Sequence, residues 1–70
     1  MSLLDLNSAS TSELEALPGI GPVLAQNIID YRSEQGPFRS VDELDLVKGI
    51  GEKKLAGVRN LVYVGARQSD

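Results

Sequence analysis

The sequence lacks cysteine and histidine altogether, and it has few aromatic residues. Without cysteine there is no disulfide, and without either residue type the usual ligands of a zinc site are missing. Three aromatic side chains, Tyr31, Phe38 and Tyr63, are too few for a protein that binds single strands by stacking bases on aromatic rings. No apolar run approaches the roughly 18 residues of a membrane span, and no signal peptide is recognisable. We therefore expect no membrane contact by this chain.

The same absences argue against catalysis. Seventy residues form one small domain, which we expect to cover residues 1–70 and to leave little room for a substrate pocket. The serine and lysine residues show no recognisable pairing of a nucleophile with a base. The carboxylates of Asp42, Glu43 and Asp45 are interpreted as capping and solvated groups and not as metal ligands. We expect no enzyme, no cofactor and no metal site.

The charge is unevenly distributed along the chain, although the net charge is only −3. Residues 1–45 carry two arginines and eight carboxylates, a net of −6, whereas residues 46–70 carry five basic groups and two carboxylates, a net of +3. Local charge decides where a polyanion docks more than total charge does. A solvated helix face is the alternative interpretation of the basic groups.

A repeat is the main feature that is present. Residues 10–21 align with residues 40–51 at a spacing of thirty, with six of twelve positions identical, and both copies end in Gly-Ile-Gly. Each copy is typical of a short helix, a tight glycine turn and a second helix. Such a turn exposes backbone N–H groups at a helix start, which is a phosphate-binding geometry.

The signals for helix ends divide the chain into four helices. Ser10 and Glu13 form a capping box, which predicts a helix over about 11–16. The next helix is predicted from Pro22 to about Gln35, ended by a Gly-Pro pair. A second capping box, Ser40 with Glu43, precedes a third helix, and the last begins near residue 52. No strand pattern is found, so we expect an all-α fold.

The two copies predict two helical hairpins packed as a compact, pseudo-symmetric four-helix domain. The first motif is expected over about 10–35 and the second over about 40–62, followed by a frayed tail at 65–70. Ile20 and Ile50, each between two glycines, are expected to point inward, and Gly21 to permit a turn that a side chain would block.

The first turn and its flanks resemble the helix-hairpin-helix motif in the segment Leu17-Pro-Gly-Ile-Gly-Pro-x-x-Ala25. The wider pattern is similar to the ComEA-type domain of competence proteins. It comprises Leu6-Asn7-Ser-Ala9, Tyr31-Arg32 and Gly36-Pro-Phe-x-Ser-Val-x-Glu-Leu44. The resemblance extends from about residue 4 to residue 62.

The resemblance implies a non-enzymatic module that binds double-stranded DNA without sequence preference, as in the DNA-receptor domain of a DNA-uptake protein. Such a receptor would be extracytoplasmic, membrane-anchored or secreted in its full-length form, and other components of an uptake or processing assembly would be further partners. The DNA-binding residues expected from it are Gly19, Ile20, Gly21, Val23, Lys48, Gly49, Ile50, Gly51, Lys53 and Lys54.

Charge distinguishes the two turns. The first is followed by Pro-Val-Leu and the second by Glu-Lys-Lys, so we expect the second to hold DNA more strongly. Arg32 is interpreted as a surface charge, and Asn7 as a hydrogen-bonding residue that fixes the N-terminal turn. Two alternatives stay open: a protein-interaction or structural module that keeps the fold without DNA, and an accessory DNA-binding domain of a DNA-processing enzyme.

Overall fold

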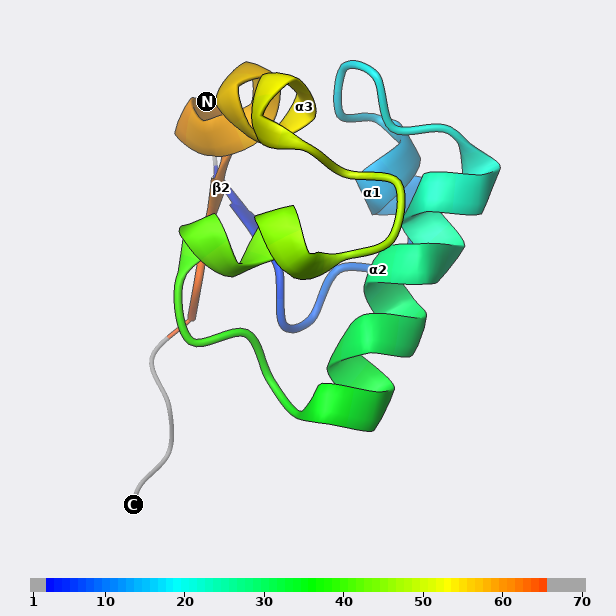
Figure 1. Cartoon of the computed structure of the whole chain (residues 1–70), viewed down its shortest axis with the longest axis vertical. Helices are drawn as coiled ribbons and strands as arrows, with labels where there is room; N and C mark the ends of the chain where they lie inside the picture. The colour runs from blue at the N-terminus through cyan, green and yellow to red at the C-terminus, as the bar shows by residue number, and fades with distance from the viewer. Residues whose placement is uncertain (1–2, 66–70) are drawn as a thin grey trace.

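The computed structural model describes residues 3–65 and is mostly helical (Figure 1). The first hairpin consists of α1 and α2, and the second of the 3₁₀ helix η1 and of α3, which continues into a short 3₁₀ turn, η2. The bounds are α1 Thr11–Glu15, α2 Pro22–Gln35, η1 Val41–Leu46, α3 Glu52–Val58 and η2 Arg59–Leu61. The expected all-α fold is confirmed. None of the described helices is both long enough and apolar enough to span a membrane.

The repeat in the sequence is also a repeat in the packing. Five buried positions of the first hairpin have a buried counterpart thirty residues later: Leu14 and Leu44, Leu17 and Val47, Ile20 and Ile50, Ala25 and Leu55, Ile28 and Val58. The backbone hydrogen bonds of the turns repeat as well: the amide of Ile20 donates to the Leu17 carbonyl at 3.1 Å, and that of Ile50 to the Val47 carbonyl at 3.0 Å. The two hairpins therefore share one backbone design and bury their apolar faces against each other.

The ends of α2 lie where the sequence predicts them. Pro22 occupies the first turn, where its missing N–H removes no helical hydrogen bond. Gly36 ends the helix with φ of +91°, a conformation that glycine adopts without strain. The capping box of α1 is also confirmed: the Glu13 amide donates to Ser10 Oγ at 3.2 Å, and the Ser10 amide donates to Glu13 Oε1 at 2.9 Å. The helix α1 itself ends at Glu15.

The second capping box is not formed, and its helix is 3₁₀. Ser40 makes no side-chain capping hydrogen bond. The Glu43 carboxylate instead accepts from the Arg39 amide at 2.7 Å and from the Tyr31 hydroxyl at 2.7 Å. Because this carboxylate is held by α2 and by the linker, the box predicted from local sequence is wrong. The contact ties η1 to the end of α2.

A two-residue parallel pairing joins the ends of the described chain, although the sequence predicts no strand. Strand β1 (Leu4–Asp5) pairs with β2 (Val62–Tyr63). The Asp5 carboxylate accepts from the Gly65 amide at 3.0 Å. The rest of the predicted frayed tail, 66–70, lies outside the described residues.

The N-terminal segment is also hydrogen-bonded to α2. Arg32, expected as a surface charge, is half-buried, and its guanidinium donates to the Leu6 carbonyl at 2.8 Å. That expectation was wrong, because α2 passes beside the N-terminal segment. The backbone N–H of Asn7 donates to Asp5 Oδ1 at 2.9 Å, so the Asp5 carboxylate holds the N-terminal turn. The Asn7 side chain, expected to bond locally, instead bonds to the backbone of Phe38.

Candidate nucleic-acid interface

The two glycine turns have matching backbones, and glycine is required at the first glycine of each. Gly19 has φ of +80° and Gly49 has φ of +89°, in the left-handed region that other residues rarely adopt. Ile20 and Ile50 point inward as predicted, each only 4% exposed. Each isoleucine anchors its turn in the core, so the loops between the helices are fixed in place.

The second glycine of each turn has no structural need to be glycine. Gly21 (φ −94°) and Gly51 (φ −110°) are extended, a conformation open to any residue, so the prediction that Gly21 permits the turn is wrong. A Cβ built on either residue would meet nothing within 4 Å. The space in front of both is open, and an external group can approach the backbone closely there.

Unpaired N–H groups face this open space. Gly21 and Gly51 are the N-cap residues of α2 and α3, and neither helix has a capping side chain. The first amides of a helix have no intrahelical acceptor, and the helix dipole makes them attractive to an anion. Pro22 removes one donor from the first turn, which leaves the amides of Val23 and Leu24. The second turn keeps three such amides, those of residues 52–54.

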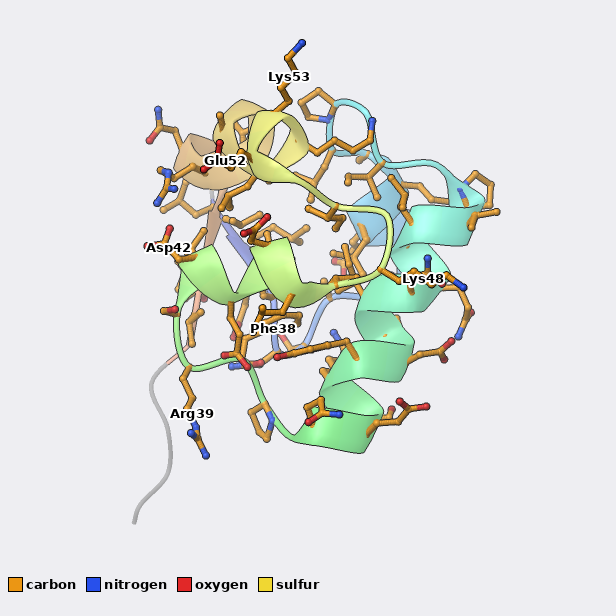
Figure 2. All side chains as sticks on the ribbon, viewed as in Figure 1. Phe38, Arg39, Asp42, Lys48, Glu52 and Lys53 are labelled. Carbon is orange, nitrogen blue, oxygen red and sulfur yellow. The ribbon has the colours of Figure 1, made fainter. Side chains whose placement is uncertain are left out.

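The three lysines near the second turn are exposed, and within residues 3–65 none of them forms a salt bridge. Lys53 extends from α3 into solvent, and Lys48 lies over α2 (Figure 2). Lys48 shares the rim of a groove with Asp30 and Glu34 of α2. The lysines therefore diverge, although they are close in sequence. Lys54 points towards the first turn, where its Nζ lies 3.7 Å from the position of a Cβ built on Gly19.

An acidic surface lies between η1 and α3 and reaches the second turn at Glu52, the first residue of α3. Asp42, Asp45 and Glu52 line a pocket between η1 and α3, and Arg59 pairs with Asp42. In the described part of the chain, no group of three or more acidic side chains is arranged to hold a metal ion. This acidic surface would repel a polyanion, and through Glu52 it borders the second turn.

Glu43 and Tyr31 form the most perturbed titrating pair, and it supports the fold. The Arg39 amide, and then the Tyr31 hydroxyl, hold the pKa of Glu43 below its ordinary value. The same hydrogen bond, with burial and the negative charge of Glu43, raises the pKa of Tyr31. Both shifts are explained by these contacts, which join α2, the linker and η1.

The structure adds Leu24 to the residues expected from the sequence. Its amide is one of the free donors of the first turn, and its side chain lies against Gly49 of the second. The thirty-residue offset that pairs Leu24 with Lys54 is visible in the sequence, but the contact across the hairpins is not. Val23, among the expected DNA-binding residues, is 72% exposed at the start of α2.

Comparison with known proteins supports the domain type. Residues 2–63 match the family model described as helix-hairpin-helix motif. The chain is 36% identical over 63 residues to ComE operon protein 1 of Bacillus subtilis (strain 168). It is 39% identical over 66 residues to Endonuclease/exonuclease/phosphatase family domain-containing protein 1 of Danio rerio, and 41% identical over 69 residues to Kinesin-like protein KIF22 of Mus musculus.

The matched region is a small part of each relative. These alignments cover 90%, 94% and 94% of this chain, but only 31% of the Bacillus protein, 12% of the Danio protein and 10% of the Mus protein. Three proteins with different names thus contain a similar segment. The similarity therefore describes a module, and the activities of the whole relatives do not follow from it.

Proposed function

The chain belongs to the helix-hairpin-helix family, and we propose that it binds double-stranded DNA without sequence preference through the phosphate contacts of both glycine turns. The DNA-binding residues are those expected from the sequence, with the amides of Leu24 and Glu52 added and without Ile20 and Ile50. These two side chains are buried, and their amides already donate to the Leu17 and Val47 carbonyls. No catalytic step is part of the proposal. Endonuclease/exonuclease/phosphatase family domain-containing protein 1 of Danio rerio matches this chain over only 12% of its own length.

The observation that carries the proposal is the open space at Gly21 and Gly51. The fold needs glycine at Gly19 and Gly49 for their positive φ, but it gains nothing from glycine at the other two positions. A ligand that approaches the backbone closely accounts for these two residues, because a Cβ there would stand between the ligand and the amides. A phosphate is the ligand that suits free N–H groups at helix starts.

Two such turns, related by the repeat, suit the two strands of a duplex. Hydrogen bonds from backbone amides and lysines to phosphates position a protein but do not distinguish bases. Few aromatic side chains are available for stacking, which favours duplex over single strands. Lys53 and Lys48 add charge on the side of the second turn, which also keeps one more amide donor than the first.

The biological setting that we propose is a DNA receptor in an uptake protein of the ComEA type, and hence extracytoplasmic. The support is 36% identity over 90% of this chain to ComE operon protein 1. An accessory DNA-binding domain in a larger DNA-processing protein is the second candidate, favoured by 39% identity to the Danio protein. The domain's own task, holding duplex DNA, is the same in both settings.

Fluorescence anisotropy with labelled oligonucleotides tests the proposal. Duplexes of several sequences should bind with similar affinity, and single strands more weakly. Two to four neutralised phosphates would give a slope of log K against log salt of roughly −0.9 per phosphate. No duplex binding at low salt, or a strong preference for one sequence, would contradict the proposal.

A charge reversal with a matched control identifies the surface. Lys53→Glu/Lys54→Glu should abolish low-salt binding, and Lys53→Glu alone should weaken it. Arg39→Glu makes the same charge change as Lys53→Glu at the opposite end of the molecule (Figure 2) and should have little effect. If Arg39→Glu weakened binding as much as Lys53→Glu, the DNA would not dock at the turns.

A further inference from the structure

The two hairpins exchange one side chain each. Leu24 is the third residue of α2 and Lys54 the third of α3, and they stand thirty residues apart, as Gly19 and Gly49 do. They are therefore the same position of the repeat, occupied once by an apolar and once by a charged side chain. Each of them lies over the turn of the other hairpin and not over its own.

The contacts at the two glycines establish this exchange. A Cβ built on Gly49 would lie 2.5 Å from Leu24 Cδ2, so Leu24 fills the space over the second turn. A Cβ built on Gly19 would lie 3.7 Å from Lys54 Nζ, so the Lys54 ammonium lies over the first turn. The hydrogen bond from Asn27 Nδ2 to the Lys48 carbonyl, 3.0 Å, also fixes α2 against the second turn.

We infer that Lys54 supplies the positive charge for the phosphate at the first turn, across the interface between the hairpins, while Lys53 serves the second turn. This inference rests on the proposed function. The first turn has no basic residue of its own, and Pro22 removes one of its amide donors. An ammonium beside Gly19 replaces that donor with a charge-assisted hydrogen bond, which is stronger than a neutral one.

The charge of the second hairpin is thereby shared between both turns. The expectation that the second turn holds DNA more strongly followed from the sequence positions of the lysines. With Lys54 at the first turn, Lys53 remains at the start of α3 with its side chain extended into solvent, and Lys48 lies over α2 (Figure 2). The first turn is complete only when the second hairpin is folded against it.

Changes in backbone amide chemical shifts during a titration with duplex DNA show which turn each lysine serves. Lys54→Gln and Lys53→Gln remove the same charge from adjacent exposed positions, so each is the control for the other. Both should flatten the salt slope by about 0.9. For each variant, the spectrum at saturating duplex is compared with the spectrum of the same variant without DNA. In this comparison Lys54→Gln should lose most of the duplex-induced shift that the wild type shows at residues 19–24. Lys53→Gln should affect residues 51–53 instead.

The outcomes separate this inference from the proposed function. Suppose that the wild-type chain shows duplex-induced shifts at both turns. If Lys54→Gln then alters the shifts only at residues 51–53, or if both variants give the same pattern of shifts, the inference is overturned and the proposed function stands. If the wild-type chain shows no shift at either turn at low salt, the proposed function fails, and the inference fails with it.

Discussion

The side-chain amide of Asn7 bonds to both backbone groups of Phe38, thirty-one residues away. Its Nδ2 donates to the Phe38 carbonyl at 3.1 Å, and its Oδ1 accepts from the Phe38 amide at 2.6 Å. Phe38 is fully buried and stacks on Tyr31 with ring centroids 5.2 Å apart. One side chain thus fixes the linker between the hairpins to the N-terminal turn, and with it the relative position of the two glycine turns.

Asn7→Ala should lower the free energy of unfolding by about 1–3 kcal/mol, because it leaves the Phe38 N–H and carbonyl without a partner. Urea denaturation followed by circular dichroism measures this change. Ser8→Ala alters the neighbouring exposed residue and should be within about 0.5 kcal/mol of wild type. A cost for Asn7→Ala no larger than that of Ser8→Ala would show that the linker is held by Phe38 packing alone.

Gly49→Ala should destabilise the domain more than Gly19→Ala. Both substitutions force alanine into a positive φ, at about 1–2 kcal/mol each. Only Gly49→Ala also drives a methyl group into Leu24, which lies 2.5 Å from the new atom. Thermal unfolding of the variants gives the ranking.

A double-mutant cycle isolates the cost of the clash between Leu24 and the methyl group that Gly49→Ala introduces. In the Leu24→Ala background the extra cost of Gly49→Ala should disappear, whereas the cost of Gly19→Ala should not change. Equal coupling of Leu24→Ala to both glycine variants would contradict the exchange of side chains between the hairpins.

Gly57→Ala should stabilise the domain. Gly57 lies inside α3 at an ordinary φ, and a Cβ there would meet nothing within 4 Å. Alanine in a helix is favoured over glycine by about 0.5–1 kcal/mol, which raises Tm by roughly 4–8 °C per kcal/mol in a domain of this size. Duplex affinity should be unchanged, because residue 57 is beyond the first turn of the helix. A fall in Tm would mean that α3 requires glycine for a reason absent from these contacts.

The free energy of unfolding should fall at both acid and alkaline pH, through Glu43 and Tyr31 respectively. The pKa of Glu43 is lowered by folding, so its contribution is complete above its ordinary value of 4.5 and is lost as the pH falls through the folded value. The pKa of Tyr31 is raised, so its contribution is complete below 10.0 and is lost as the pH rises through the folded value. Urea denaturation across the pH range measures both losses.

Tyr31→Phe separates the two groups. It should remove the alkaline loss and only part of the acid loss, because the Arg39 amide still lowers the pKa of Glu43. If the variant still lost the full amount of stability at alkaline pH, that loss would have to come from another titrating group.

The sequence predicts those elements whose ends are marked locally. Pro22 marks the start of α2 and Gly36 its end, and Ser10 with Glu13 determines the start of α1. Burial at a spacing of thirty follows from the repeat. The helix ends depend on residues within a few positions of each other, where intrinsic preferences operate without competition from tertiary contacts.

The remaining features depend on contacts between distant segments. Glu43 is held by Tyr31 and by the Arg39 amide, so η1 differs from α1 despite the same Ser-x-x-Glu spacing. Strands of two residues are too short to show alternation. The position of Lys54 over Gly19 arises from the packing of two helices, and no local pattern encodes it. The two glycine turns can therefore be predicted from sequence, but the position of Lys54 over the first turn cannot.

The most direct test of the account is the duplex affinity of Gly21→Ala/Gly51→Ala, measured by anisotropy at low salt beside its thermal stability. Both positions are extended and open, so Tm should change little, with a cost below about 1 kcal/mol for the altered N-caps. Because the two methyl groups would keep phosphates from the amides, affinity should fall at least about tenfold, equivalent to about 1.4 kcal/mol. An unchanged affinity in the folded variant would contradict phosphate binding by the glycine turns.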